Sequence, residues 1–302
     1  MKILVTGGMG FIGRHLVIHL LKKGNKITIF DNFSNSDKKS IINLQNEGVN
    51  VIEGDITESD KILNAAKDQD IVIHLAAKIS VDESIKNPTE TFRINVNGTK
   101  NVLESCKKNN VKKIIVASSA AVYGEGFPKI KLNENMKTNP ISPYGKSKLI
   151  MEQEIKKIIS KYDDMNCIIL RFFNIFGIGQ SFEYAGVITK FIKEISMNKP
   201  VKIFGDGMQT RDFVSIHDVV ESIYDAIKNG KNGTYNIASG KAITINELAE
   251  FMISLSRKDL DIHHISEKHG DIRYSEADIS LAKSEIKYVP KLGLNEIKTL
   301  LE

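Results

Sequence analysis

Tyr144 and Lys148 stand four residues apart, downstream of Ser118 and Ser119. Four residues is about one turn of an α-helix, so a phenol and an ammonium group at this spacing would share one helix face. A nearby ammonium favours phenolate over phenol and so lowers a pKa that is ordinarily about 10. Such a phenolate can take a proton from an alcohol or sugar hydroxyl at neutral pH. The pair is therefore a candidate acid/base, although the same spacing also arises by chance on solvated helix faces.

Three glycines, Gly7, Gly10 and Gly13, follow a short apolar run at Lys2–Thr6 and precede an amphipathic segment. In a strand–loop–helix unit, glycines at this spacing allow a tight turn, close approach of the backbone to a pyrophosphate, and close packing of helix on strand. The diphosphate then lies at the positive N-terminus of the helix. The spacing therefore predicts a dinucleotide-binding loop.

Asp31 ends the second predicted strand, close to the expected distance of about 20 residues beyond the glycine loop. A carboxylate here accepts hydrogen bonds from the adenosine ribose and repels a 2′-phosphate, and no arginine lies near it in the sequence. We therefore predict NAD rather than NADP as the cofactor, the alternative being that Asp31 is only a turn residue. Asp55 follows the third predicted strand, where it could bind the adenine amino group or cap a helix.

Six short runs rich in Val, Ile and Leu lack polar alternation, as expected for strands that are covered on both faces. They lie at residues 2–6, 26–30, 50–53, 71–75, 113–117 and 167–171. Helical patterns lie between them, near residues 11–23, 57–67, 89–109 and 144–162. This alternation predicts an α/β protein with a Rossmann-type, doubly wound parallel sheet.

After about residue 175 the alternation becomes looser. We expect helices near residues 184–197, 217–229 and 244–255, strands at 201–204 and 234–237, and one or two more helices after residue 271. The predicted division is an NAD-binding domain over residues 1–175, which carries the catalytic residues, and a smaller C-terminal α/β substrate-binding lobe over residues 176–302. Some segments of the lobe are expected to return to the first domain.

The composition of the 302-residue chain narrows the class of protein. Its 42 basic and 37 acidic residues are spread along the sequence, and without a concentrated basic patch no nucleic-acid partner is expected. Cys106 and Cys167 fit neither a zinc site nor a disulfide framework, so we expect buried thiols in a reducing cytoplasm and no metal. The sequence shows no signal-peptide h-region and no apolar run of about 18 residues, so no membrane partner is expected either.

Ordered motifs along nearly the whole chain resemble the extended short-chain dehydrogenase/reductase family, in particular its NAD-dependent sugar-nucleotide epimerases of the UDP-glucose 4-epimerase type. Besides the glycine loop, the matching segments are residues 74–77, 95–99, 118–124, 140–144, 171–177 and 205–213. The resemblance implies an enzyme that uses NAD, acts on a UDP-sugar and forms a homodimer.

The resemblance also implies roles for single residues. Tyr144 would be the acid/base, Lys148 would hold the nicotinamide ribose and lower the tyrosine pKa, and Ser119 would bind the sugar hydroxyl that is oxidised. The implied NAD-binding residues are Gly7, Gly10, Phe11, Ile12, Gly13, Asp31, Asn32, Asp55, Ile56, Leu75, Ala76, Ala77, Asn95, Tyr144, Lys148 and Phe173. The implied substrate-binding residues are Ser119, Asn174, Arg211, Lys268, Asp271 and Ser275.

Within the substrate set, Asn174 and Arg211 are implied to hold the diphosphate, Arg211 through paired donors that suit phosphate oxygens. Relatives often carry an arginine three residues before the aspartate that corresponds to Asp271. This chain has Lys268 there, which supplies charge but no planar guanidinium. Asp271 is implied to accept a hydrogen bond from the uridine ribose, and the neighbouring His269 is either a ligand contact or a surface residue.

The two residues after Ser119 bear on the reaction. Relatives that eliminate water carry Asp-Glu there, and decarboxylases of UDP-glucuronate commonly carry a glutamate at the second position. Ala120 and Ala121 cannot move a proton, so both activities are disfavoured. Epimerization needs only that the 4-keto sugar turns over while the nucleotide stays anchored, so that hydride returns to the opposite face. The sequence therefore predicts a UDP-hexose 4-epimerase.

Ser275 bears on substrate size, because the register places it where some relatives have a tyrosine near the sugar C2. A small side chain could admit an N-acetyl group, so we predict tolerance of UDP-GlcNAc and UDP-GalNAc alongside UDP-glucose and UDP-galactose. The alternatives left open are a UDP-glucuronate 4-epimerase, another NAD-dependent nucleotide-sugar epimerase or reductase, and a non-catalytic NAD-sensing regulator.

The implied homodimer would pair the helices near residues 89–109 and 144–162 across a two-fold axis. The second helix carries an apolar stripe that fits such packing. The same stripe fits equally well if it faces the chain's own sheet. Its residues are Met151, Ile155, Ile158, Ile159 and Tyr162.

Overall fold

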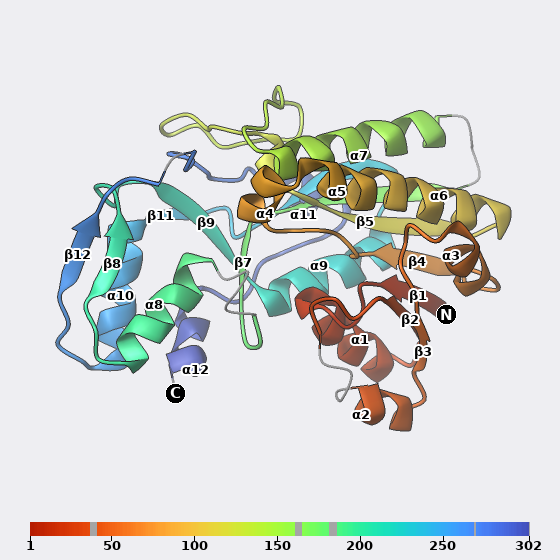
Figure 1. Cartoon of the computed structure of the whole chain (residues 1–302), viewed down its shortest axis with the longest axis horizontal. Coiled ribbons are helices and arrows are strands. Elements are labelled where there is room, and N and C mark those ends of the chain that lie inside the picture. The colour runs from red at the N-terminus through yellow and green to blue at the C-terminus, as the bar shows by residue number, and fades with distance from the viewer. Residues whose placement is uncertain (37–40, 161–164, 181–185, 269, 302) are drawn as a thin grey trace.

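The computed structural model describes residues 1–36, 41–160, 165–180, 186–268 and 270–301. Within these residues, seven parallel strands form the central sheet in the order β10-β6-β5-β4-β1-β2-β3 (Figure 1). The strands are β1 (Lys2–Thr6), β2 (Lys26–Asp31), β3 (Asn50–Glu53), β4 (Ile71–His74), β5 (Lys113–Ser119), β6 (Asn166–Phe172) and β10 (Gly233–Ile237). The predicted Rossmann-type α/β class and the six predicted strands are confirmed.

Helices cover both faces of this sheet (Figure 1). One face carries α1 (Phe11–Lys22) and α9 (Ile216–Asn229), and the other carries α3 (Ser59–Ala65), α6 (Thr99–Lys108) and α7 (Pro143–Ile159). Neighbouring strand residues enter different cores: Ile3 and Val5 pack with the α1 side, whereas Leu4 packs with the α6 side. The strands are continuously apolar because both of their faces are buried.

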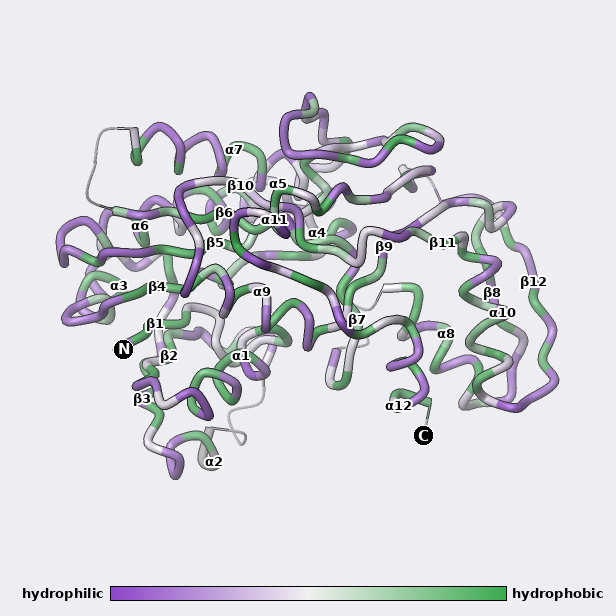
Figure 2. The backbone as a smooth tube through the Cα atoms, turned by 180° about the vertical axis from the view of Figure 1, so that it is seen from behind, coloured by the Kyte–Doolittle hydropathy of each residue, from purple (hydrophilic) through white to green (hydrophobic). Residues whose placement is uncertain are grey.

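A second group of elements lies at the left of Figure 1. It contains a three-stranded sheet, β11-β9-β7, and a two-stranded sheet, β12-β8. The strands are β7 (Asn174–Phe176), β8 (Val201–Phe204), β9 (Thr210–Ser215), β11 (Ala242–Thr244) and β12 (Ile262–Ile265). The helices are α8 (Val187–Ser196), α10 (Ile245–Ser256) and α12 (Lys298–Leu301). Phe191, Ile203 and Leu248 are buried together in a core that is separate from those of the central sheet. Hydrophobic and hydrophilic stretches alternate along α8 and α10 (Figure 2).

The chain does not divide cleanly between these two groups. Strand β10 and helix α9 come from the second half of the sequence, yet β10 pairs with β6 in the central sheet and α9 packs on α1. Strand β7, in contrast, joins the small sheet by pairing with β9. The boundary at residue 175 stays a prediction.

The segment expected to be one helix near residues 89–109 has three parts. Asn87 caps α5 (Pro88–Phe92), a π-helical turn follows over Arg93–Gly98, and α6 continues to Lys108. A π turn places one more residue in the turn than an α-helix does and often lies at a functional site. The remaining short helices are α2 (Ile41–Asn46), α4 (Val81–Lys86) and α11 (Ser280–Glu285).

The apolar stripe of α7 lies mostly in the chain's own core. Met151 and Ile155 are fully buried there, and Ile158 and Ile159 pack against the same cluster. Tyr162 lies outside the described residues. The burial favours the interpretation in which the stripe faces its own sheet, so the homodimer stays a prediction. Among the helices in the described ranges, none is both long and apolar enough to cross a membrane.

Candidate active site

Helix α7 brings the predicted acid/base pair against the end of β5. Ser142 caps this helix by accepting a hydrogen bond from the backbone N–H of Gly145. Tyr144, in its first turn, shares a hydrogen bond with the hydroxyl of Ser119. One turn further, Nζ of Lys148 donates to the carbonyl oxygen of Ala117 over 2.9 Å. The structure therefore brings Ser119, Tyr144 and Lys148 together, although sequence separations of 25 and more divide the strand from the helix.

The surroundings of the pair shift the pKa values of both residues. Burial raises the pKa of Tyr144 above its ordinary value, and the hydrogen bond from Ser119 lowers it only in part. Burial also lowers the pKa of Lys148 to about 8, against the opposing charge of Glu152. The lowering of the tyrosine pKa by Lys148 stays a prediction, because burial and the hydrogen bond from Ser119 are what shift this pKa in the structure. The Lys148 ammonium is directed at the Ala117 carbonyl, and withdrawal from water disfavours both charged forms.

A cavity of about 710 Å³ opens along the carboxyl ends of the central strands, which is where doubly wound sheets bind their ligands. Every predicted NAD-binding residue except Asn95 lines it. These residues are Gly7, Gly10, Phe11, Ile12, Gly13, Asp31, Asn32, Asp55, Ile56, Leu75, Ala76, Ala77, Tyr144, Lys148 and Phe173. Ser119 lines the same cavity, so the acid/base pair and the dinucleotide loop share one space.

The glycine loop leaves no room for side chains at two positions. Gly7 has a φ of +69°, and a Cβ atom on it would lie 2.7 Å from the backbone nitrogen of Ala76. A Cβ atom on Gly13 would overlap the carbonyl oxygen of Gly7 and lie 2.6 Å from Cα of Gly8. Because these glycines have no side chains, the start of α1 can lie close against the loop. The N-terminus of the helix then faces the cavity and can bind a diphosphate.

Asp31 is 8% exposed and supports the glycine loop directly. Its carboxylate accepts hydrogen bonds from the backbone N–H groups of Met9 at 2.9 Å and of Phe33 at 2.8 Å. Burial raises its pKa, and the two hydrogen bonds lower it in part. The geometry suits the predicted contact with an adenosine ribose, because the carboxylate also lines the cavity.

Asn32 and Asp55 lie beside one another in the cavity lining. The sequence predicts that Asp55 contacts the adenine. Nδ2 of Asn32 donates to the Asp55 carboxylate at 2.9 Å. Burial would raise the pKa of Asp55, but hydrogen bonds from Thr57 and Asn32 bring it below the ordinary value. Because Thr57 also donates to this carboxylate, Asp55 caps the start of the following segment as well as lining the cavity.

We expect Asp31→Asn to reduce the preference for NAD over NADP by about tenfold, or about 1.4 kcal/mol. The substitution removes the charge that repels a 2′-phosphate but keeps one oxygen to accept a backbone hydrogen bond. Titration of the purified protein with each dinucleotide measures the two Kd values. Asp60→Asn, an exposed change on α3, is the matched control. An unchanged ratio of the two Kd values would remove Asp31 from cofactor selection.

Asn95 lies behind the cavity wall instead of lining it. Its side chain accepts from the backbone N–H of Lys78 at 2.8 Å and donates to the carbonyl of Lys78 and to the hydroxyl of Ser147, both at 2.9 Å. The π turn that contains Asn95 thus ties the loop after β4 to α7. In this structure Asn95 positions the cavity-lining loop that contains Lys78. Its hydrogen bonds do not support the predicted direct contact with NAD.

Apart from Ser119, the predicted substrate residues lie on the small sheet and on the segment after β12, outside the lining of the 710 Å³ cavity. Nδ2 of Asn174 on β7 donates to the backbone carbonyl of Asp212 on β9. Arg211, also on β9, forms an ion pair with Asp271 in which Nη2 and Oδ1 are 2.5 Å apart. The structure thus brings Asn174, Arg211 and Asp271 into one neighbourhood.

Two other predicted substrate residues occupy different positions. Lys268 pairs with Asp82 on α4 at 3.1 Å and so reaches across to the elements beside Tyr144. Ser275 is 7% exposed, so its small side chain is enclosed. His269 lies outside the described residues.

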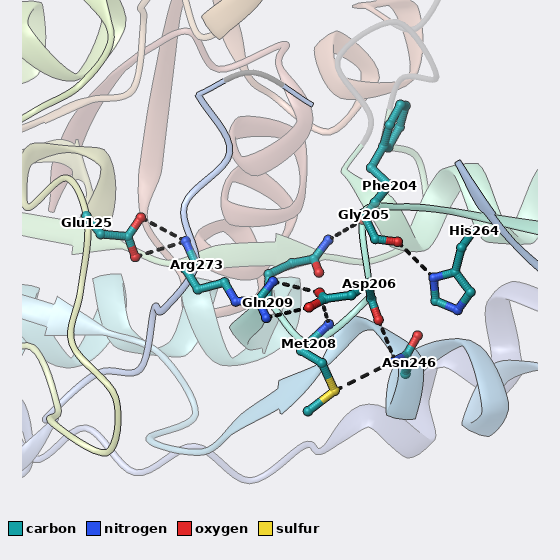
Figure 3. A network of polar contacts seen from close by, with 9 residues as sticks. All are labelled: Glu125, Phe204, Gly205, Asp206, Met208, Gln209, Asn246, His264 and Arg273. Atoms are coloured by element: carbon teal, nitrogen blue, oxygen red, sulfur yellow. Dashed lines mark hydrogen bonds and ion pairs between the residues drawn. The ribbon is translucent and has the colours of Figure 1, made fainter. Parts of the chain in front are cut away.

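Arg273 lies in the segment after β12 and binds the turn between β8 and β9 (Figure 3). Its guanidinium makes a bidentate ion pair with Asp206 at 2.6 and 2.7 Å, and its backbone N–H donates to Glu125. The pair with Arg273 lowers the pKa of Asp206 to about 2. Gly207 has a φ of +73° within this turn and lies against the side chain of Asn246. Arg273 therefore organises the backbone of residues 205–207, at the start of the matched 205–213 segment.

The cavity is also lined by residues that the sequence reasoning missed. They include Arg14, Lys78, Ser118, Ile175, Gly179 and Gln180. Lys78 directly follows the matched 74–77 segment, so its place could have been inferred. Gly179 and Gln180 carry no local signal, and Arg14 reaches them across the fold by donating to the carbonyl of Gly179.

A family model described as the NAD dependent epimerase/dehydratase family matches residues 3–238. A Methanocaldococcus jannaschii protein provisionally named UDP-glucose 4-epimerase is 39% identical over 97% of this chain and 95% of its own length. A solved UDP-N-acetylglucosamine 4-epimerase from Methanobrevibacter ruminantium is 36% identical, with a TM-score of 0.92 and coverage of 99% and 96% of the two chains. The UDP-glucose 4-epimerase of Thermotoga maritima, solved with UDP-glucose, is 31% identical, with a TM-score of 0.93 and coverage of 100% and 97%.

The chain therefore belongs to the NAD-dependent epimerase/dehydratase family, within the extended short-chain dehydrogenases/reductases. It is an NAD-dependent isomerase.

Proposed function

We propose that this chain is a UDP-hexose 4-epimerase that interconverts UDP-glucose and UDP-galactose through a transient 4-keto sugar. One observation carries the proposal: Ser119, Tyr144 and Lys148 meet at the cavity that the glycine loop also lines. Ala120 and Ala121, directly after Ser119, offer no group for elimination or decarboxylation. The described site thus has the groups for a reversible oxidation, and the two positions after Ser119 carry none of the acids and bases that relatives with the other activities have there.

The roles follow from the chemistry of each group. Ser119 holds the C4 hydroxyl of the sugar by a hydrogen bond, and Tyr144 takes the proton from that hydroxyl and returns it after the sugar has turned over. Lys148 donates to the nicotinamide ribose and keeps a positive charge near the phenolate. NAD, when bound, supplies the acceptor for the hydride that leaves C4. The glycine loop, Asp31, Asn32 and Asp55 would hold its diphosphate and adenosine.

The groups on the small sheet fit a substrate diphosphate. Arg211 offers a planar set of donors, and Asn174 adds an amide from the neighbouring strand. Lys268 adds a further positive charge, and Asp271 is an acceptor for a ribose hydroxyl. Anchoring the nucleotide here while the keto sugar turns over is what inversion at C4 requires. We also infer a homodimer, which sedimentation of the purified protein would test.

The small side chain of Ser275, where some relatives have a tyrosine, supports acceptance of N-acetylated sugars. We expect the wild-type protein to epimerise UDP-GalNAc as well as UDP-galactose, and Ser275→Tyr to lose at least about tenfold in kcat/KM for UDP-GalNAc alone, since a filled pocket rejects the larger group. Product analysis by chromatography measures both. Ser284→Tyr, an exposed change on α11, is the control. Turnover of UDP-galactose with none of UDP-GalNAc by the wild-type protein would contradict the proposal.

The decisive experiment for the function is a substrate panel without added cofactor. Purified protein is incubated with UDP-hexoses, UDP-N-acetylhexosamines and UDP-uronates, and the products are identified. Interconversion of UDP-glucose and UDP-galactose supports the proposal. Turnover of UDP-glucuronate alone would assign a UDP-glucuronate 4-epimerase, and activity only with added NADH would assign a reductase.

A further inference from the structure

Helix α7 contacts the end of β5 through three residues spaced four apart. Tyr144 shares a hydrogen bond with Ser119, Lys148 donates to the carbonyl of Ala117, and Glu152 accepts from the hydroxyl of Ser118 at 2.5 Å. Residues four apart lie on one helix face, so three successive turns of the helix meet the three residues Ala117, Ser118 and Ser119 of the strand. Glu152 is thus the third member of the same row as the acid/base pair.

The carboxylate of Glu152 has a buried counter-ion on the next strand. Nε and Nη2 of Arg171 on β6 lie 3.0 and 2.7 Å from its two oxygens. Glu152 is 1% exposed and Arg171 is 3% exposed, so both charges are withdrawn from water. A bidentate pair of this kind fixes orientation as well as distance. The pair therefore links α7 to both β5 and β6.

Nη1 of Arg171 is also bound. Nη1 donates to the phenol oxygen of Tyr123 at 2.9 Å, and that phenol donates to Oδ1 of Asn236 on β10 at 2.7 Å. The guanidinium carbon lies 4.8 Å from the centre of the Tyr123 ring. Because Tyr123 holds the guanidinium of Arg171, we expect Arg171 to stay in place if α7 and Glu152 shift. The network fixes the position of Glu152 from the far end of the sheet.

Within the described part of the chain, the groups that face Lys148 are few. Strand β5 presents an uncharged carbonyl and two hydroxyls, and β4 presents His74, which lies between the hydroxyls of Thr6 and Thr99 at 2.7 and 2.9 Å. Burial lowers the pKa of His74 to about 3, so it is neutral at physiological pH. Helix α7 itself presents the neutral phenol of Tyr144 and, one turn beyond, Glu152. The carboxylate of Glu152 is thus the negative charge that acts on Lys148.

We propose that Glu152, with Arg171 as its counter-ion, is a positioning residue for the hydride-transfer site, holding α7 in register on β5 and placing a negative charge one turn from the Lys148 ammonium. The inference rests on the proposed function, because it assigns Glu152 a part in catalysis through Lys148. Without the carboxylate, burial acts on Lys148 unopposed and the ammonium is lost at lower pH.

The test compares the wild-type protein with Glu152→Gln, Arg171→Met and the double variant. The protonation of Lys148 is followed by NMR with lysine labelled at Cε, assigned by comparison with Lys148→Arg, and the pH profile of kcat is measured beside it. We expect the Lys148 midpoint to fall by about one pH unit in Glu152→Gln and in the double variant. The alkaline loss of kcat moves to lower pH by the same amount. Arg171→Met, which keeps the carboxylate, does not lower the midpoint.

The double variant separates a catalytic role from a merely structural one. Each single change leaves an uncompensated buried group and lowers the Tm, whereas removal of both partners restores it in large part. A purely structural pair predicts wild-type titration and kcat in a double variant of near wild-type Tm, and that result overturns the proposal. Lowering of the midpoint by Arg171→Met as much as by Glu152→Gln also overturns it.

Glu154→Gln is the matched control, because Glu154 lies on the same helix in a partly exposed pair with Lys100 at 3.1 Å. It should leave the titration and kcat at wild-type values. The NMR titration needs no substrate. If the wild-type protein turned over no UDP-sugar, the proposed function would fail, while the effect of Glu152 on Lys148 would still be measured.

Discussion

Replacement of Tyr144 by phenylalanine is expected to lower kcat for UDP-galactose by about 10³-fold, within the range that a positioned acid/base contributes. The residue that carries this phenol shares a hydrogen bond with Ser119 and lines the cavity. Phenylalanine keeps the ring and its packing, so the fold and the NAD content should stay near wild-type values. A loss in kcat with little change in KM would place the effect on the chemical step.

Steady-state rates, the NAD content of the purified protein and the Tm are measured together for this variant. Tyr224→Phe is the control, since Tyr224 lies on α9 beside Lys23 and Lys228, away from the cavity. Activity of Tyr144→Phe within a factor of a few of wild type would refute the acid/base role. A parallel loss of NAD would instead mean that the phenol serves mainly in cofactor binding.

Substitution of Gly13 by alanine should abolish retention of NAD, and with it the activity. The added methyl group would overlap the carbonyl of Gly7 and press on Cα of Gly8, both of which are backbone atoms that no rotamer change can move. Overpacking of this kind costs about 1–3 kcal/mol, and here the strain falls on the loop that faces the diphosphate. A 10²-fold or larger rise in the Kd for NAD is about the effect expected if 3 kcal/mol is lost from binding.

Gly293→Ala serves as the matched change, because a Cβ atom there meets no neighbour within 4 Å and the backbone needs no positive φ. Dinucleotide titration and the absorbance of bound cofactor compare the two variants. Wild-type affinity in Gly13→Ala would mean that the loop relaxes around the methyl group, and close helix–strand packing would then not be what holds the diphosphate.

Much of the central fold could be predicted because its signals are local. Strands buried on both faces must be apolar throughout, as Leu4 and Val5 show by entering different cores. Gly13 of the loop is required by contacts with Gly7 and Gly8, only a few residues away. The start of α7 is likewise local, since Ser142 and Pro143 form its cap and first turn. In the structure, most of the residues chosen from such motifs line one cavity, and their roles stay predictions.

The less accurate predictions concern pairings between distant residues. The helix expected near residues 89–109 contains a π turn, and Asn95 on it binds Lys78 and Ser147, which lie 17 and 52 residues away. Arg211 pairs with Asp271 across 60 residues. Spacing along a helix or strand carries no information about such partners.

The sequence by itself determined the α/β class, the NAD loop and the Tyr144–Lys148 pair that defines the site, because each depends on residues within one turn, one strand or one loop. Only the tertiary structure decided the protonation of that pair. Burial raises the tyrosine pKa and lowers that of the lysine, and Glu152 acts on the lysine from a network anchored by Arg171. Burial and counter-ions are set by which strands and helices pack together, and the free energy of a charge depends on that packing rather than on its neighbours in the chain.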